Sequence, residues 1–184
     1  MKGTEDWSIA IEQVYERLAL CFQTPGHSIR LPTVTTVHAG LPHSRTMVLR
    51  DIDDQNFVFF TDKRSLKAHG IDANCKACMH CYDSKNRMQL KVLGLLKAVE
   101  NHSKMSDWKK EGLKRYTDYG SELPPGHPFP ASVPRNTLDH AIVNFMVLAL
   151  VPSQLEILQL NRSVHNRFQW THEADTWKRL QVVP

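Results

Sequence analysis

The change in hydrophobic period near residue 26 constrains the fold of this chain more than any other feature of its sequence. Before that point, apolar residues recur at spacings of three and four, as on one face of an amphipathic helix: Trp7, Ile11, Val14, Tyr15, Leu18 and Phe22. After Thr24-Pro25-Gly26, apolar and polar residues alternate with a period of two. We therefore expect an N-terminal helix within residues 1–28, capped by Thr4 and favoured at its start by Glu5 and Asp6, and then a mainly β chain.

Short segments rich in Val, Thr and Phe follow the helix and are separated by turn-forming residues. Two further helices are expected, over 65–74 and 103–116. A Pro-rich loop is expected over 117–137, within which residues 120–135 cannot be regular structure. Many short strands with few helices favour an antiparallel barrel or sandwich in a single domain over residues 1–184. The predicted strands are 33–38, 45–52, 57–61, 76–82, 88–100, 141–151, 155–160, 164–170 and 177–183, with a turn over 38–44.

Composition excludes several classes of protein. The 184 residues are 41% hydrophobic and 23% charged, which excludes a disordered chain or a disulfide scaffold. The longest apolar run, 145–151, is far shorter than the ~20 residues that a bilayer requires, so we expect no membrane partner. The net charge of +4 is not concentrated enough for a nucleic-acid partner. Four cysteines and an acidic start indicate reduced thiols and a cytoplasmic location.

The segment Phe60–Lys67 carries the clearest signal for a ligand. A predicted strand ends at Thr61 and a predicted helix begins near Ser65, beside the basic residues Lys63, Arg64 and Lys67. Free backbone N–H groups at a helix N-terminus, with a hydroxyl and cations nearby, suit a phosphate group. The alternative is that Ser65 only caps the helix and that the lysines are solvated.

Two arginines, Arg45 and Arg50, bracket another predicted strand. With a period of two they face opposite sides unless a bulge intervenes, so they can hold two different anionic groups. The alternative is two solvated charges at the ends of a strand.

Three cysteines, Cys75, Cys78 and Cys81, are spaced as some metal ligands are. In a strand, however, Cys75 and Cys81 face one side and Cys78 the other, and a closed site needs four ligands. We therefore expect buried structural thiols and no metal.

The remaining candidates lie near the C-terminus, since the familiar nucleophile, zinc and nucleotide motifs are missing from the sequence. In His165-Asn166-Arg167-Phe168, the imidazole and the guanidinium stand two residues apart, so a strand places both on one face. Such a pair suits an anionic or electron-rich ligand, although a surface hairpin pair explains it equally well.

Taken together, these segments resemble the pyridoxamine 5′-phosphate oxidase family of FMN-binding split-barrel proteins. The matching segments, in chain order, are Arg45–Arg50, Phe59–Asp62, Ser65–Lys67, Met88–Gly94 and His165–Phe168, with a terminal Trp177–Pro184. Each segment alone is weak, whereas their order and approximate spacing together are specific.

The resemblance implies an antiparallel, Greek-key split barrel and a homodimer with FMN in each of two clefts between the subunits. It implies that His165 and Arg50 orient a small-molecule substrate near the flavin. It also implies that FMN is held by Arg45, Thr46, Met47, Val48, Phe60, Thr61, Ser65, Lys67, Gln89 and Arg167.

The departures from the family pattern concern the substrate and leave most of the cofactor site intact. The oxidase's helical Tyr-x3-Arg-x3-Ser clamp has no match, because Trp108, Gly112 and Tyr116 occupy the nearest such spacing. Leu66 stands in place of an arginine, and Ser163 in place of the arginine of the Arg-x-His pair. The sequence thus predicts an FMN-dependent oxidoreductase with an unidentified substrate. The alternative is a flavin-binding or haem-handling protein without turnover, and a nucleic-acid-binding barrel ranks last.

Overall fold

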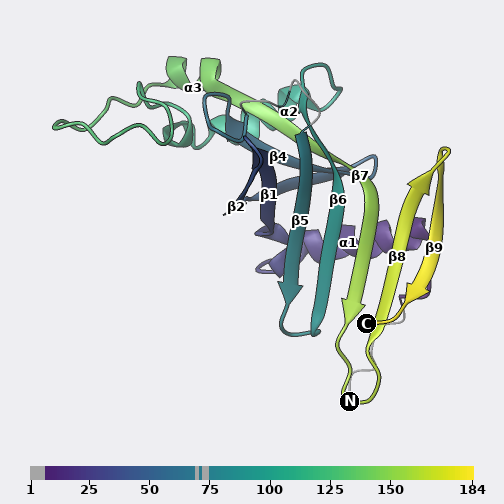
Figure 1. Cartoon of the computed structure of the whole chain (residues 1–184). Coiled ribbons are helices and arrows are strands. Elements are labelled where there is room, and N and C mark those ends of the chain that lie inside the picture. The colour runs from purple at the N-terminus through teal and green to yellow at the C-terminus, as the bar shows by residue number, and fades with distance from the viewer. Residues whose placement is uncertain (1–6, 69–70, 72–74) are drawn as a thin grey trace.

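The computed structural model describes residues 7–68, 71 and 75–184. Within these ranges there are three α-helices, α1 (Ile11–Gln23), α2 (Met105–Leu113) and α3 (Leu138–Asn144), and two single 3₁₀ turns, η1 (Ser28–Arg30) and η3 (Tyr116–Asp118). The antiparallel strands that form the sheet are β1 (Thr33–His38), β2 (Leu41–Thr46), β3 (Leu49–Asp53), β4 (Asn56–Asp62), β5 (Cys75–Asp83), β6 (Met88–Val99), β7 (Phe145–Gln159), β8 (Asn166–Glu173) and β9 (Thr176–Val182) (Figure 1).

The order of the strands requires the sheet to curl. It runs β2-β1-β5-β6-β7-β4-β3, with β8 and β9 continuing from the far end of β7. Strands β2 and β3 therefore lie at opposite edges of that order, yet only Met47 and Val48 connect them. So short a link brings the two edges together without pairing them, as expected for a split barrel. The prediction of one continuous strand over 45–52 is therefore wrong. Residues 45 and 46 end β2 at one edge of the sheet, and the chain continues from Leu49 as β3 at the other edge.

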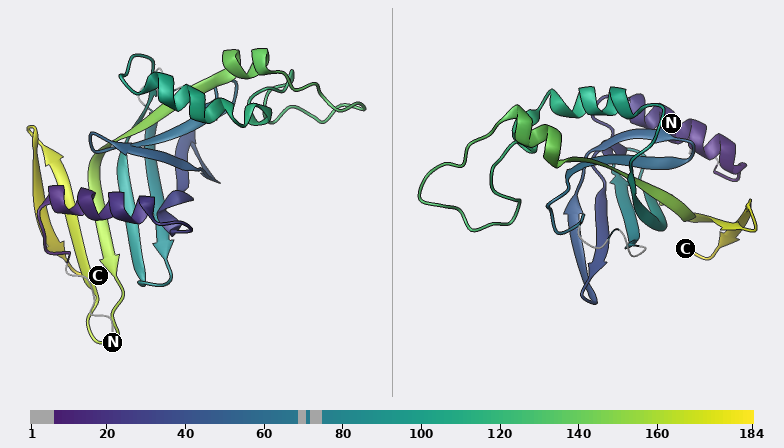
Figure 2. Two further views of the ribbon diagram at one scale, coloured as in Figure 1. Left: turned by 180° about the vertical axis from the view of Figure 1, so that it is seen from behind. Right: turned by 90° about the horizontal axis from the view of Figure 1, so that it is seen from above.

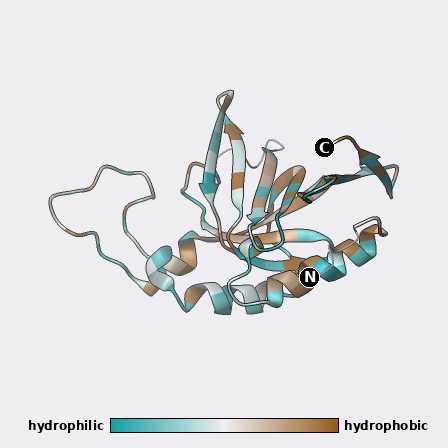
Figure 3. Cartoon of the chain, turned by 90° about the horizontal axis from the view of Figure 1, so that it is seen from below, coloured by the Kyte–Doolittle hydropathy of each residue, from teal (hydrophilic) through white to brown (hydrophobic). Residues whose placement is uncertain are grey.

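Helix α1 covers one face of the sheet and builds the main core with it (Figure 2). Val14 and Leu18 on its apolar side are fully buried. Figure 3 shows that hydrophobic and hydrophilic residues occupy different sides of this helix. The strands supply every second residue to the same core, for example Leu90 and Val92 of β6. Each large aliphatic side chain so buried stabilises the fold by about 1.5–3 kcal/mol.

The start of the helix differs from the prediction. It begins at Ile11, with Ala10 as the N-terminal flanking residue, whose N–H donates to Gln13 Oε1 at 3.3 Å. The Thr4 cap, with Glu5 and Asp6, lies outside the described residues. Trp7 is buried as its spacing suggested, but it reaches the core from the segment before the helix.

A second, smaller core lies on the other side of β4 and places α2 and α3 against the barrel. Phe57 and Phe59 of β4 enter the main core, whereas Val58 and Phe60 pack with Trp108 of α2. Strand β4 is buried on both faces for this reason. Helix α2 is held to β3 by polar contacts as well: the Trp108 indole N–H and Lys104 Nζ both lie 3.1 Å from Asp51 Oδ2.

Three further predictions of local structure are corrected. The predicted turn over 38–44 contains β2, which pairs with β1 across a tight turn at Ala39-Gly40, where both residues have positive φ. The predicted strand 141–151 begins as helix α3, capped by Thr137 Oγ1, which accepts from the His140 N–H at 3.1 Å. Strand β7 then runs unbroken to Gln159 past a bulge opposite Gly94, which merges two predicted strands.

The Pro-rich segment, residues 117–137, projects from the body of the molecule as an arm (Figures 1 and 2). Its two legs are joined at the base, where the Thr137 N–H donates to Gly120 O at 2.9 Å and Glu122 N–H to Arg135 O at 3.0 Å. The prediction that most of this segment is irregular is correct, apart from η3 at its start. In the part of the chain that the structure describes, no helix has the length and apolar character needed to span a bilayer.

Candidate functional site

The loop after β4 is shaped by Asp62 and does not begin a helix within the described residues. Residues 65–68 form turns, and most of the remaining predicted helix, over 65–74, lies outside the described residues. The Arg64 N–H donates to Asp62 Oδ1 at 2.8 Å, and the Ser65 N–H donates to Asp62 O at 3.1 Å. The N–H groups of Arg64 and Ser65 are therefore engaged within the loop and are not free donors for a ligand.

Arg64, one of the three cations in the predicted basic cluster, has a structural role. Its guanidinium contacts Asp62 Oδ2 at 2.7 Å and donates to Ser121 O at 2.9 Å and to Glu122 O at 3.3 Å. The side chain thus ties the base of the arm to the loop after β4.

Lys67 of this loop lies within electrostatic reach of Arg45. Arg45, from β2, donates to Thr36 Oγ1 at 2.8 Å and to Val34 O at 3.2 Å. Burial lowers the pKa of Arg45. Burial, and then the positive charge of Arg45, lowers the pKa of Lys67, while Asp62 acts in the opposite direction. Neither cation forms an ion pair with a carboxylate among the described residues. Two partly desolvated cations without a paired carboxylate favour a bound anion.

Two buried hydroxyl groups lie at the end of β4 and in the loop that carries Lys67. Thr61 and Ser65 are buried, and their oxygens are 3.3 Å apart. The Ser65 hydroxyl also donates to Asp62 O at 2.7 Å, and this hydrogen bond fixes the orientation of the hydroxyl group. Of the predicted cofactor residues, the structure thus brings Thr61 into contact with Ser65, and it places Arg45 within electrostatic reach of Lys67.

The end of β2 and the link to β3 contain three more predicted cofactor residues in different environments. Met47 is buried and its N–H donates to Pro32 O at 3.0 Å, whereas Val48 is 40% exposed and Thr46 ends β2 at the surface. Val48 stands two residues before Arg50.

Arg50 lies on an aromatic base. Its guanidinium carbon is 5.3 Å from the centre of the Phe60 ring, which itself meets Phe145 edge to face at 5.1 Å. Burial raises the pKa of Tyr119, and the positive charge of Arg50 counteracts part of this rise. Phe60 thus supports a catalytic candidate as well as being a predicted cofactor residue.

Gln89 and Arg167 lie elsewhere in the chain. They share a row across β6, β7 and β8 with Leu158, on the face opposite to the buried residues Met88 and Leu90. Arg45, in contrast, contacts Thr36 on the core-facing side of β1. Within one chain, the predicted cofactor residues therefore lie on two different faces of the sheet.

The Arg167 side chain is already paired. Its Nη2 lies 3.0 Å from both oxygens of Glu156, while Lys91 Nζ lies 3.0 Å from Glu156 Oε1. Burial raises the pKa of Glu156, but the hydrogen bonds from Lys91 and Arg167 outweigh it, so the net shift is downward. Arg167 Nε is buried without a hydrogen-bond partner in the structure.

His165 is exposed and precedes β8, so it does not share a strand face with Arg167 as the spacing suggested. The β7–β8 connection also places it at the opposite end of β7 from Phe145, the neighbour of Phe60 (Figure 1). The two catalytic candidates, His165 and Arg50, are therefore not brought together within one chain.

The cysteine triplet alternates along β5 as predicted. Cys75 and Cys81 lie on the core-facing side, whereas Cys78 belongs to the other face beside Lys91 and Glu156. Burial raises the pKa of all three thiols. The described residues contain no group of three or more potential metal ligands.

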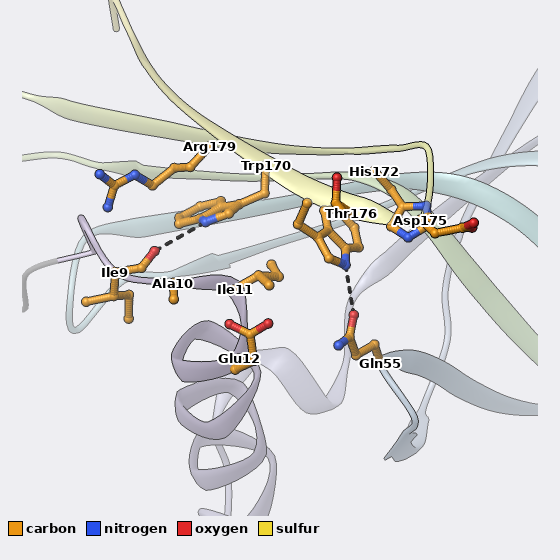
Figure 4. Close-up of a pocket in the computed structure, with 11 residues that line it drawn as sticks. Ile9, Ala10, Ile11, Glu12, Gln55, Trp170, His172, Asp175, Thr176 and Arg179 are labelled. Atoms are coloured by element: carbon orange, nitrogen blue, oxygen red, sulfur yellow. Dashed lines mark hydrogen bonds between the residues drawn. The ribbon is translucent and has the colours of Figure 1, made fainter.

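A cavity of about 680 Å³ lies elsewhere, between the start of α1, the β3–β4 turn and the β8–β9 hairpin (Figure 4). The indole N–H of Trp177 donates to Gln55 Oε1 at 2.9 Å, and that of Trp170 to Ile9 O at 3.3 Å. None of the predicted site residues lines this cavity.

Two contributors to the site were missed from the sequence. The first is Thr36, which orients Arg45 by a hydrogen bond. The turn at Ala39-Gly40 could have revealed it, because a hairpin there pairs the strands that carry the two residues. Tyr119, whose pKa responds to the charge of Arg50, comes from a segment without regular periodicity, so no local pattern indicated it.

Comparison with known proteins gives a consistent result. Residues 4–100 match the family model described as pyridoxamine 5′-phosphate oxidase, FMN-binding domain. A pyridoxine/pyridoxamine 5′-phosphate oxidase from Caulobacter vibrioides is 37% identical over 68 residues, which cover 36% of this chain and only 31% of that enzyme.

Two solved structures share the fold along nearly the whole chain. A pyridoxamine 5′-phosphate oxidase-related, FMN binding protein from Nostoc punctiforme superimposes with a TM-score of 0.72 at 23% identity, covering 96% of this chain and 100% of that one. PhzG from Burkholderia lata, solved with tetrahydrophenazine-1-carboxylic acid, gives 0.75 at 18% identity, covering 99% and 100%. Since the family model spans more than half of the sequence, this chain belongs to the pyridoxamine 5′-phosphate oxidase family of FMN-binding domains.

Proposed function

We propose that this protein is an FMN-dependent oxidoreductase whose cofactor phosphate is held by Arg45 and Lys67. The observation that carries the proposal is the approach of these two partly buried cations without a paired carboxylate among the described residues. A phosphate between them relieves their mutual repulsion and replaces lost hydration with charge-assisted hydrogen bonds. The Thr61 and Ser65 hydroxyls supply further polar contacts for the same group.

A bound flavin supplies the hydride chemistry, and the protein supplies position and electrostatics. The residues next to the proposed phosphate site continue along the β2–β3 link through Val48 to Arg50. The short separation along the chain and the support of Arg50 by Phe60 favour Arg50 as a residue that orients the substrate.

The division of the predicted residues between two faces supports a homodimer. Gln89, Arg167 and His165 do not reach the Arg45–Lys67 site within one chain. In the proposed dimer, these residues of one subunit complete the cleft of the other. In that dimer, Arg167 gives up one of its two hydrogen bonds to Glu156 and forms a contact with the cofactor instead.

The experiment compares FMN with riboflavin, which lacks the phosphate. Lys67→Ala and Arg45→Ala are each expected to weaken FMN binding about 10- to 150-fold, because a hydrogen bond to a charged group contributes about 1.5–3 kcal/mol. The control is Lys63→Ala, since Lys63 is an exposed cation of the same loop and should leave FMN affinity unchanged.

Riboflavin should bind the unmodified protein weakly and lose little further affinity in the two variants. Equal losses for both ligands would show that Arg45 and Lys67 act through folding and not through the phosphate. Sedimentation of the FMN-loaded protein as a dimer would agree with the shared cleft.

A further inference from the structure

The cavity of about 680 Å³ in Figure 4 has no part in the proposed function, yet its volume lies within the range of small-molecule sites, roughly 300–1,000 Å³. Three segments that are distant in the sequence build it: the start of α1, the β3–β4 turn at Gln55 and the β8–β9 hairpin. None of the residues assigned above to the cofactor or the substrate lines it. A ligand of this cavity is therefore separate from the flavin.

Two tryptophans hold the walls of the cavity in place. The indole N–H of Trp170 donates to Ile9 O at 3.3 Å and fastens β8 to the segment before α1. The indole N–H of Trp177 donates to Gln55 Oε1 at 2.9 Å and fastens β9 to the β3–β4 turn. The His172 ring meets Trp177 edge to face, with centroids 5.1 Å apart. Because its N–H group is already used, the half-buried Trp177 ring offers a ligand aromatic surface and no hydrogen-bond donor.

The wall on the helix side is aliphatic. Figure 4 shows Ile9, Ala10 and Ile11 at the start of α1, across from the strand that carries Trp170. An aliphatic wall opposite an aromatic one suits a flat apolar group, and the fixed positions of both walls reduce the entropy lost on binding.

Charged side chains complete the lining, with two carboxylates, Glu12 and Asp175, against one guanidinium, Arg179. None of these three groups forms an ion pair in the part of the chain that the structure describes. In Figure 4, Arg179 lies at one end of the cavity and Asp175 at the other, with Glu12 between them on the helix side. The space beside Glu12 and Asp175 therefore carries an excess of negative charge, which favours a cationic group.

The positive end of α1 does not convert this space into an anion site. The Ala10 N–H donates to Gln13 Oε1 at 3.3 Å, and Glu12 stands in the first turn, where its negative charge balances the helix dipole. A further anion at this end would meet the Glu12 carboxylate at close range.

We propose that this cavity binds a small aromatic amine, whose ring packs against Trp177 and whose ammonium group contacts Glu12. Asp175 adds to the negative potential on the same side, and the faces of aromatic rings attract cations as well. The site does not depend on bound FMN, so it is a second ligand site of the protein.

The test is a calorimetric titration of three matched probes into the full chain, with and without FMN. Benzylamine carries the ammonium group, benzyl alcohol is its neutral counterpart, and phenylacetate carries an anionic group on the same ring and methylene. We expect benzylamine to bind about 5-fold or more tightly than either of the others, and its affinity should be the same in the presence of FMN.

Glu12→Gln should weaken benzylamine binding about 5-fold and leave the affinity for benzyl alcohol unchanged. The control is Glu16→Gln, which removes an exposed carboxylate of the same helix that does not line the cavity and should change the affinity less than about 2-fold. Arg179→Gln removes the guanidinium from the lining and should strengthen benzylamine binding about 2-fold. Because the Glu12 and Arg179 variants shift the affinity in opposite directions, unfolding cannot explain both results.

Equal affinities for the three probes, tighter binding of phenylacetate, or no binding of any probe would overturn the proposal. Equal losses of affinity in Glu12→Gln and Glu16→Gln would do the same, because they would show that the amine responds only to the net charge of the helix. Displacement of benzylamine by FMN would also refute it, since the amine would then occupy the flavin site.

Discussion

Replacement of Gly112 by alanine tests how closely α2 is packed against the barrel. A Cβ atom at this position would lie 2.2 Å from Phe145 Cε2 and 2.7 Å from Phe145 Cζ. Ordinary van der Waals contact begins at 3.4 Å, so the ring must retreat by roughly 1.2 Å. Its retreat is opposed by Phe60 and Tyr119, which meet it edge to face with centroids 5.1 and 5.3 Å away.

The magnitude follows from two opposing contributions. Without a clash, Gly112→Ala stabilises a helix by about 1 kcal/mol, because glycine has the lower helix propensity. Overpacking a well-packed core costs about 1–3 kcal/mol, and the confined ring places this site near the upper value. We therefore expect a net loss of about 2 kcal/mol, which lowers the Tm of a chain this long by roughly 4–8 °C.

Thermal unfolding followed by circular dichroism measures the effect, and Phe145→Leu supplies the matched background. Removing the ring is itself destabilising, but it removes the obstacle, so Gly112→Ala in that background should be neutral or stabilising by up to about 1 kcal/mol. The resulting coupling free energy isolates the contact between the two positions. A higher Tm for Gly112→Ala alone would refute the packing argument.

Two further predictions concern a thiol and a substrate. Burial raises the pKa of Cys81 to about 12, so at pH 8 iodoacetamide should label Cys81 far more slowly in the native protein than in urea; mass spectrometry showing equal rates would contradict this. The FMN-loaded protein should oxidise pyridoxamine 5′-phosphate slowly or not at all, because the space at Gly112 excludes a clamp side chain there and Ser163 replaces an arginine. A kcat/KM comparable with that of an authentic oxidase in the same assay would contradict this.

Much of the fold was predictable because alternation is a local property. Strand β1 was predicted with its observed bounds, and β4, β5 and β6 within one residue at each end. The errors occur where tertiary contacts decide the outcome. Strand β2 was missed because Leu41–Thr46 has no strong apolar alternation. Its structure is decided by its pairing with β1 across the short turn at Ala39-Gly40.

The candidate site was predictable in its residue types but not in its geometry. Lys67 was singled out as part of a basic helix start, whereas its environment is set by Arg45 from a distant strand. Arg64 belongs to the same basic run, yet Asp62 and the arm occupy its guanidinium. Sequence spacing cannot separate the two cations, because only the tertiary structure shows which of them has a carboxylate partner.

The most direct test of the account is the affinity of the unmodified protein for FMN relative to riboflavin, measured by quenching of flavin fluorescence. If Arg45 and Lys67 hold the cofactor phosphate, FMN should bind at least about 10-fold more tightly than riboflavin, and the preference should fall as ionic strength rises. Equal affinities for the two flavins, or no binding of FMN at all, would contradict the assignment of this loop as the phosphate site.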